Sequence, residues 1–466
     1  MHISDIIGII ILSTLYFLQG VALGLPLGSL PIILVEKGAT YAELSAISLS
    51  GFPFSFKILW ASFLDKYFIK SFGKRKTYIV PCKYIIGILY LIYSSYVDDD
   101  INNLNITPIA TVLLITIILE ATADIAVDGW VLTILSEENV ALGPTCQSVG
   151  QNLGWFLSQF IFVQITSVKF ANDYIYTTPS DQPLISYGAY FKFWGIFTLI
   201  VTFLIHFFKK EVNPTTREFK SIWEVYSTLK GFYHNKNLRF LCAFLLVYKA
   251  GFAFMDPAGF LQLVKKGFPK ETLTTIGILA YPIQFIAPIW VAKYNLKKME
   301  LQMVFKGIFV SIVFTIGMML TVNLYQNGSG DGGWILYLIA AMAFTNQIGK
   351  IIMEVSSASF NTRICDPSVG GTFITALASV ANVHRTIIQP LGLTVLDFVN
   401  FFAANAIGVA YEIYLSYKLE NKCIQLQEAP KEIWNLEHVS GEHGDYVEMK
   451  EKLTLSPGKK ESDSLL

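Results

Sequence analysis

The sequence predicts an all-α polytopic membrane protein with twelve transmembrane helices in two bundles of six. Of its 466 residues, 53% are hydrophobic and 15% are charged, whereas soluble domains carry about 25% charged residues. The charges are absent from many windows of roughly 20 residues, the length that spans the hydrocarbon layer of a bilayer. A basic stretch separates these windows into two sets of six. The 35 basic residues balance 35 acidic residues, so a nucleic-acid-binding surface is not expected.

Each predicted helix is an apolar window between polar or turn-forming segments. The first bundle, 1–208, is expected to contain helices at 6–28, 42–64, 78–97, 107–134, 146–167 and 188–208. The second bundle, 238–418, is expected to contain helices at 238–261, 272–291, 302–322, 333–357, 369–394 and 397–418.

A basic linker, 209–237, joins the two predicted bundles. Its apolar residues recur at helical spacing, which predicts an amphipathic helix on the membrane surface; they are Ile222, Val225, Tyr226 and Leu229. The polar tail, 419–466, is expected to be disordered. It ends in Glu-Ser-Asp-Ser-Leu-Leu, which fits an acidic dileucine sorting pattern.

Basic residues favour the loops that are cytosolic if both termini lie in the cytosol, so the positive-inside rule predicts that orientation. The glycosylation sequons at Asn105 and Asn327 then fall on the opposite side. The five cysteines show no CxxC or metal-ligand spacing. We therefore expect neither a disulfide framework nor a metal or cofactor site.

The loop between the second and third predicted helices resembles the Asp-Arg-x-Gly-Arg-Arg loop of the major facilitator superfamily. The six-plus-six arrangement with a long middle loop favours the same architecture. The acidic residue is expected to accept hydrogen bonds from a neighbouring helix end as part of a cytosolic gate, and the lysines are expected to act as anchors at anionic headgroups. The residues of this gate are Asp65, Lys66, Gly73, Lys74, Arg75 and Lys76.

Longer segments resemble the eukaryotic acetyl-CoA transporter family. They are 53–81, the block Ala-Asp-Ile-Ala-Val-Asp-Gly-Trp within 121–152, and Asp-Pro-Ser-Val-Gly-Gly-Thr-Phe at 366–373. The resemblance implies transport of acetyl-CoA from the cytosol into the lumen of the endoplasmic reticulum, with Golgi or endolysosomal membranes as alternatives. Exchange for CoA, facilitated diffusion and proton-linked transport all stay open. Bacterial muropeptide permeases are more distant relatives. The chain departs from the family at His384 and Arg385, where the family has a small, Gly-rich stretch.

The fourth predicted helix carries Glu120, Asp124 and Asp128 at i, i+4 and i+8, so the three carboxylates lie on one face. Ionisable groups inside a membrane need partners, a wet cavity or a function. Two interpretations stay open. The carboxylates line the transport path and couple protons, or they form structural ion pairs with neighbouring helices.

Four cations stand inside predicted helices. Lys249 and Arg385 lie near the membrane midplane and are expected to hold the phosphates of CoA. Lys57 is expected to bind substrate or to pair with the helix-four carboxylates. Lys350 is expected to pair with Glu354, four residues along the same helix.

Further polar residues complete the candidate site. Gln147, Gln151 and Asn152 lie on roughly one side of the fifth helix and either hydrogen-bond the substrate or hold helices together. His384 is a candidate pH-sensitive gate. Asp256, followed by proline, marks an expected break in the seventh helix.

Small residues recur every four positions in the first helix, at Gly20, Gly24 and Gly28, and predict close helix packing. Trp130 and Trp155 could stack on adenine, but tryptophans near helix ends are more often interfacial anchors.

The sequence thus predicts an alternating-access carrier and not an enzyme, with the lipid bilayer and acetyl-CoA or CoA as partners. The alternatives are a carrier of another bulky organic anion (a nucleotide conjugate, glutathione disulfide or a muropeptide-like molecule), a transceptor without net transport, and a membrane-bound acyltransferase that uses His384. The oligomeric state is not indicated.

Overall fold

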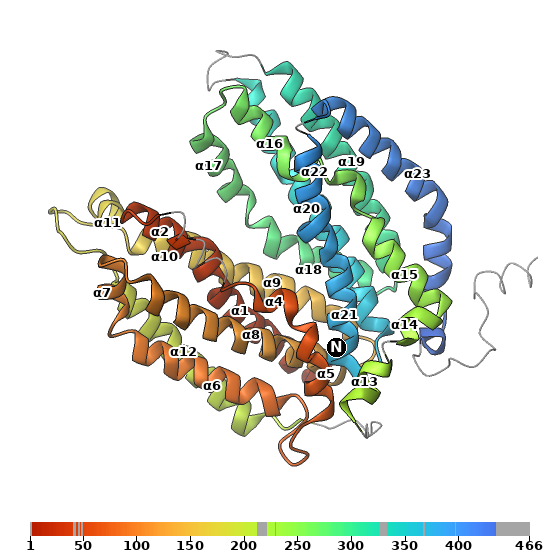
Figure 1. The fold of residues 1–466 in the computed structure, drawn as a ribbon, viewed down its shortest axis with the longest axis horizontal. Helices are drawn as coiled ribbons and strands as arrows, with labels where there is room; N and C mark the ends of the chain where they lie inside the picture. The colour runs from red at the N-terminus through yellow and green to blue at the C-terminus, as the bar shows by residue number, and fades with distance from the viewer. Residues whose placement is uncertain are drawn as a thin grey trace, which may run out of the picture.

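A computed structural model describes residues 2–40, 43–44, 47, 50–211, 221–228, 230–325, 333–366, 369–396 and 398–434. All regular secondary structure in these ranges is helical, which confirms the predicted all-α class. Figure 1 shows the helices in two bundles, α1 to α12 on one side and α15 to α23 on the other.

The first bundle contains long helices with several short or π-helical continuations. They are α1 (Ile3–Gly24), η1 (Leu25–Ser29), α2 (Leu30–Glu36), α4 (Pro53–Phe56), α5 (Ile58–Lys66), α6 (Lys76–Tyr93), α7 (Val97–Asn102), α8 (Ile106–Ile134), η2 (Val140–Leu142), α9 (Gly143–Phe156), η3 (Leu157–Ile161), α10 (Phe162–Ile165), α11 (Val168–Tyr174) and α12 (Tyr187–Phe208).

The linker and second bundle follow the same pattern. Their helices are α13 (Ile222–Thr228), α14 (Lys230–His234), α15 (Lys236–Val247), η4 (Ala250–Phe252), α16 (Met255–Lys265), α17 (Lys270–Ala280), α18 (Ile283–Asn295), α19 (Glu300–Leu324), α20 (Trp334–Ile364), α21 (Gly370–Val383), η6 (His384–Ile388), α22 (Gln389–Val395), α23 (Phe401–Gln427) and η7 (Lys431–Trp434).

Within the described ranges, six helices are long and apolar enough to cross a membrane, and one bent pair makes a seventh if it counts as a single span. Of the other predicted spans, the third and the twelfth are the single helices α6 and α23, the second is divided into α4 and α5, the seventh into α15, η4 and α16, and the eleventh into α21, η6 and α22. Broken helices are tolerated at membrane depth where they line a cavity. The arrangement is consistent with the twelve predicted spans.

The last helix continues to Gln427, nine residues past its predicted end at 418. Cys423 and Leu426 are buried, and the side-chain oxygen of Gln427 accepts a hydrogen bond from the backbone of Leu301 at 2.6 Å. Hydropathy missed this extension because the opposite face of the helix is polar. The final residues with the dileucine pattern, and the sequon at Asn327, lie outside the described residues.

The predicted amphipathic linker helix is represented by the short helix α13. Val225 is fully buried, and the hydroxyl of Tyr226 donates a hydrogen bond to the backbone oxygen of Leu59 in α5. These two side chains, expected to face the membrane surface, therefore pack on protein. Leu229 lies outside the described residues.

Helices α1 and α9 pack at close range through glycines, which confirms the packing prediction. A Cβ atom on Gly20 would lie 2.1 Å from the backbone oxygen of Gln151, and one on Gly24 would lie 2.6 Å from Cβ of Ser158. Gly154 of α9 approaches the backbone oxygen of Phe17 in the same way, at 2.1 Å. The two helix backbones can approach this closely only because no side chain separates them.

Gly20→Ala is expected to destabilise the protein by about 1–3 kcal/mol, because the added methyl group forces these helices apart. The matched control is Gly277→Ala in α17, where a Cβ atom meets nothing within 4 Å. Alanine is there the better helix former, by up to about 1 kcal/mol. Thermal unfolding of both variants in detergent checks the prediction, and equal midpoints for the two would contradict it.

Candidate functional site

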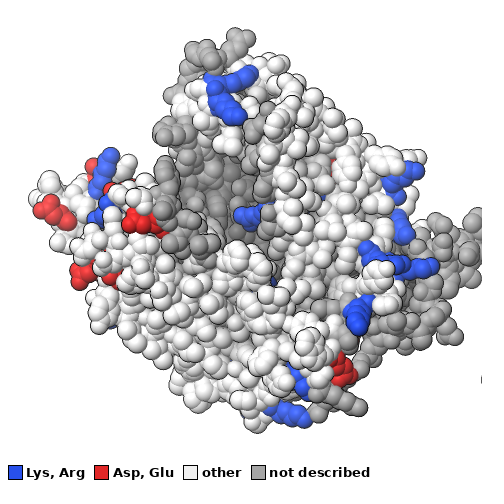
Figure 2. Space-filling view, viewed as in Figure 1, with Lys and Arg blue, Asp and Glu red and all other residues white. Residues whose placement is uncertain are grey.

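A cavity of about 1260 Å³ lies between the two bundles. Figure 2 shows the molecule hollowed there, with a basic side chain inside the hollow. Its lining includes all seven predicted substrate-binding residues together with Asp124 and Asp128; the seven are Lys57, Gln147, Gln151, Asn152, Lys249, His384 and Arg385.

The wall formed by the first bundle is built around Lys57, which stands at the break between α4 and α5. Its ammonium group forms an ion pair with Asp124 and lies 3.8 Å from Oδ2 of Asp128. Helix α1 completes the network: Gln19 donates a hydrogen bond to Asp124, and Tyr16 donates one to Asp128, each at 2.7 Å.

This network bears out the ion-pair interpretation for Asp124 and Asp128, whereas proton coupling by them stays a prediction. The predicted ion pairing with Lys57 is confirmed, and the same two carboxylates also line the cavity. Because they are four residues apart on α8, one lysine can reach both. Ion pairing and exposure to the cavity are therefore properties of the same two side chains.

Glu120, the third carboxylate of the face, is placed differently. Both of its oxygens accept hydrogen bonds from Lys83 of α6, at 2.7 and 2.9 Å, and both side chains are only 2% exposed. Glu120 does not line the cavity, so it belongs to the core of the first bundle. Sequence reasoning missed Lys83, although a lysine inside an apolar helix requires an acidic partner, and Glu120 was available.

The wall formed by the second bundle holds two ion pairs. Lys249 lies 3.0 Å from Glu354, and Lys350 lies 3.2 Å from Asp256. The predicted pair of Lys350 with Glu354 is therefore wrong. The break around η4 brings Asp256 of α16 to Lys350 of α20, and Lys249 at that break takes Glu354 as its partner.

His384 lies beside the second of these pairs. Its Nε2 atom is 3.8 Å from Oδ2 of Asp256, which also accepts a hydrogen bond from Gln389 at 2.9 Å. The histidine is buried and belongs to the π-helical segment η6. The expected role as a pH-sensitive gate stays a prediction.

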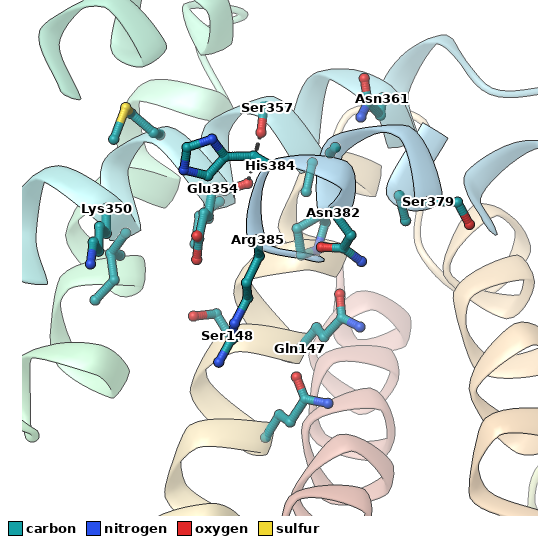
Figure 3. A pocket seen from close by; sticks show the side chains of 18 of the residues that line it. Gln147, Ser148, Lys350, Glu354, Ser357, Asn361, Ser379, Asn382, His384 and Arg385 are labelled. Carbon is teal, nitrogen blue, oxygen red and sulfur yellow. Dashed lines mark hydrogen bonds between the residues drawn. The ribbon is translucent and has the colours of Figure 1, made fainter. Parts of the chain in front are cut away.

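Arg385 follows in η6, and its side chain is exposed. Figure 3 shows it reaching into the cavity toward Gln147 and Ser148 of α9. In the ranges that the structure describes, no carboxylate lies within ion-pair distance of its guanidinium and no group accepts a hydrogen bond from it, although Glu354 is near enough to interact with it electrostatically. This guanidinium group is therefore available to an anionic ligand.

The amides of α9 also face the cavity. Asn152 donates to the backbone oxygen of Ser148 within its own helix, at 2.8 Å, and to that of Gln284 in α18 of the second bundle, at 3.4 Å, so this amide does connect helices. No side-chain hydrogen bond is formed by Gln147 or Gln151 among the described residues. These two side chains are therefore better placed to contact a ligand than to hold helices together.

The predicted tryptophans do not line the cavity. Trp130 is buried, and the indole of Trp155 donates to Gln159. The aromatic side chains that do line it were not anticipated; they are Tyr16, Phe52, Phe54, Phe56, Tyr248 and Phe252.

The predicted gate joins the two bundles at one end of the cavity. Oδ2 of Asp65 accepts hydrogen bonds from the backbone N–H and the hydroxyl of Thr372 near the start of α21, both at 2.7 Å. Oδ1 lies 2.8 Å from the guanidinium of Arg75 and 3.3 Å from Nζ of Lys74. The predicted acceptance of hydrogen bonds from a neighbouring helix end is confirmed. We call Asp65, Lys74, Arg75 and Thr372 the latch.

The basic residues of this loop do not face lipid headgroups. Lys74, Arg75 and Lys76 are 4%, 3% and 4% exposed, so the expected headgroup anchoring is wrong for them. Lys76 instead donates to the backbone oxygens of His206 and Lys209 at the end of α12, at 2.8 and 2.7 Å.

The remaining gate residues have local roles. Gly73 takes a positive φ of 112° where the chain turns into α6, and a Cβ there would collide with Glu211. Lys66, the last residue of α5, is half-buried.

Lys74 of the latch has a shifted pKa. Burial and the neighbouring Arg75 lower the pKa of Lys74 to about 8. The folded protein therefore gains stability as the pH rises from about 8 toward the usual lysine value, because only the unfolded chain still binds a proton at Lys74 in that range.

Comparisons with known proteins find similar sequences over most of the chain. A family model described as acetyl-coenzyme A transporter 1 matches residues 8–216 and 212–322. An uncharacterized protein of Schizosaccharomyces pombe is 31% identical over 82% of this chain and 73% of its own length. The anhydromuropeptide permease of Escherichia coli K12 is 22% identical over 82% of this chain and 72% of its own.

The fold also matches a solved structure. A crystal structure of the major facilitator superfamily transporter FucP in its outward conformation gives a TM-score of 0.59 at 14% identity, covering 89% of this chain and 99% of that one. This likeness confirms the predicted major facilitator fold.

Proposed function

This chain belongs to the acetyl-coenzyme A transporter family, and from that premise we propose that it carries acetyl-CoA across an organelle membrane by alternating access. It is a multi-pass membrane protein with the fold of a transporter. The proposed direction is from cytosol to lumen, in exchange for CoA. The proposed location is the endoplasmic reticulum, with both termini cytosolic and with Golgi or endolysosomal membranes as alternatives.

The observation that carries this proposal is the unpaired guanidinium of Arg385 inside the cavity. In the second bundle, Arg385 joins Lys249 and Lys350, whose charges are balanced by Glu354 and Asp256. That wall therefore has one excess positive charge when His384 is neutral. Arginine binds phosphate through two parallel hydrogen bonds, which suits a pyrophosphate or a 3′-phosphate.

The size and polarity of the cavity also support a bulky ligand. Its volume of about 1260 Å³ exceeds the roughly 300–1,000 Å³ of pockets for drug-sized ligands. The amides of Gln147 and Gln151 suit the peptide-like pantetheine arm, and the aromatic side chains of the lining suit adenine. The carrier family and fold disfavour the acyltransferase that used His384.

A second candidate is another bulky organic anion. The similarity to a bacterial anhydromuropeptide permease favours this alternative, because a cavity with one free guanidinium would also bind the carboxylates of a muropeptide.

Ligand-induced thermal stabilisation of the purified protein distinguishes the two candidates. A ligand at a hundred times its Kd stabilises the protein by about 2.7 kcal/mol. Acetyl-CoA and CoA are expected to raise the midpoint, whereas acetyl-pantetheine, which lacks the phosphates, is not. Stabilisation by an anhydromuropeptide but not by acetyl-CoA would replace the first candidate with the second.

A further inference from the structure

The two walls of the cavity carry opposite excess charges. The first bundle contributes Lys57, Asp124 and Asp128 to the lining among its described residues, so two carboxylates share one ammonium group. The second bundle has three cations and two carboxylates. With every carboxylate ionised, the first wall has an excess negative charge that opposes an anionic cargo.

The two carboxylates of the first wall are not equivalent. Asp124 is satisfied on both oxygens, by Gln19 on Oδ1 and by Lys57 on Oδ2. Asp128 accepts from Tyr16 on Oδ1, but its Oδ2 is 3.8 Å from the ammonium of Lys57, beyond hydrogen-bond distance. Among the four carboxylate oxygens of Asp124 and Asp128, Oδ2 of Asp128 is the one without a hydrogen bond from a described residue, so it is the oxygen that can take up a proton.

No other cation in the described surroundings compensates Asp128. Lys83 of α6 is committed to Glu120, and Arg75, which passes over Gly129 of α8, is committed to Asp65. Cys146 of α9 and Tyr16 of α1 supply no positive charge. Helix α21 contains no ionisable residue. Arg385 belongs to the opposite wall of the same cavity. Asp128 therefore shares its one nearby cation, Lys57, with Asp124. A carboxylate at membrane depth that is only partly compensated is costly, and taking up a proton removes that cost.

We propose that Asp128 is a proton-binding site and that one proton crosses the membrane together with the organic anion. This inference rests on the proposed function, which it extends from the cargo to the energy source. With Asp128 ionised, the charged groups of the described lining sum to zero when His384 is neutral; with Asp128 protonated, the sum is one positive charge. Proton binding therefore raises the affinity for the anion, and by linkage the anion raises the affinity for the proton.

The proton site can be tested without knowing the cargo. Infrared spectra of the full-length protein in lipid are expected to show a protonated-carboxyl C=O band that Asp128→Asn removes. The matched control is Asp256→Asn, which removes a carboxylate of the same cavity that has its own ammonium partner, Lys350, and a further hydrogen bond from Gln389. That variant should retain the band. Identical bands in the wild type and Asp128→Asn would overturn the proposal whatever the cargo proves to be.

Coupling is tested in liposomes that contain a trapped pH indicator, with labelled acetyl-CoA outside. Acidifying the outside by one pH unit is expected to raise the initial uptake rate by up to about tenfold, with acidification of the lumen as the anion enters. Asp128→Asn should lose both effects. If the wild-type uptake rate did not depend on the pH gradient and the lumen did not acidify, the proposed coupling would be overturned. Absence of uptake by every protein, with the infrared band present, would contradict the proposed cargo and not the proton site.

Discussion

Arg385→Ala is expected to weaken acetyl-CoA binding by about tenfold to a hundredfold, because a hydrogen-bonded interaction with a charged group contributes about 1.5–3 kcal/mol. The guanidinium reaches into the cavity and has no ion-pair or hydrogen-bond partner among the described residues, so a phosphate of the ligand is its proposed partner. Arg385→Lys should give an intermediate loss, since lysine keeps the charge but not the two-pronged geometry. Equilibrium binding of labelled acetyl-CoA measures both effects.

The thermal midpoint of Arg385→Ala should stay close to that of the wild type, since the substitution leaves no buried carboxylate unpaired. The matched control is Lys192→Ala, which removes an exposed cation of α12 outside the cavity. It should leave binding unchanged. Wild-type affinity in Arg385→Ala would remove this residue from the binding site, and a large fall in its midpoint would show that its role is structural.

Asp65→Asn is expected to open the latch end of the molecule. Removing the carboxylate charge leaves Lys74 and Arg75 buried beside a neutral group and weakens the hydrogen bonds from Thr372. Breaking a buried ion pair from one side costs about 3–5 kcal/mol. The latch joins α5 to α21 across the two bundles. Part of the lost stabilisation therefore destabilises the closed conformation relative to one in which this contact is open.

The opening can be measured through Ser62, which is fully buried at the same contact, 3.4 Å from the hydroxyl of Thr372. In a Ser62→Cys background, Asp65→Asn should accelerate labelling of that cysteine by at least about tenfold, since 1.4 kcal/mol already gives a factor of ten. Labelling of the native cysteines is measured in the same protein without Ser62→Cys and is subtracted.

The control for this experiment is Asp98→Asn. Asp98 also accepts a hydrogen bond from a helix start, at Gly188, with a distance of 3.1 Å, but both residues lie in the first bundle. Labelling of Ser62→Cys should be unaffected by it. If Asp65→Asn labelled no faster than Asp98→Asn, the latch would not control closure.

Several features were predictable because they depend on spacing along one helix or on a strong local motif. The spacing of Asp124 and Asp128 put both on one face, and Lys57 proved to be their partner. The acidic residue of the gate loop predicted a helix end as its partner, and Thr372 supplies it. The glycines of α1 predicted close packing, and α9 provides it.

The errors share a different cause. The spacing of Lys350 and Glu354 along one helix predicts that they pair, but the break in the seventh helix brings Asp256 closer to Lys350. Charge and hydropathy predict that Lys74 and Lys76 are membrane anchors. Neither quantity contains the information that a carboxylate or a helix end from elsewhere in the fold will bury these two side chains. Partners from distant helices depend on tertiary packing, which one-dimensional patterns do not contain.

The most direct test of the central claim is uptake of labelled acetyl-CoA by the purified protein in liposomes, with and without CoA inside. The proposed function predicts uptake that internal CoA accelerates, which would establish cargo and exchange together. No uptake under either condition, from protein shown to be folded, would contradict acetyl-CoA as the cargo.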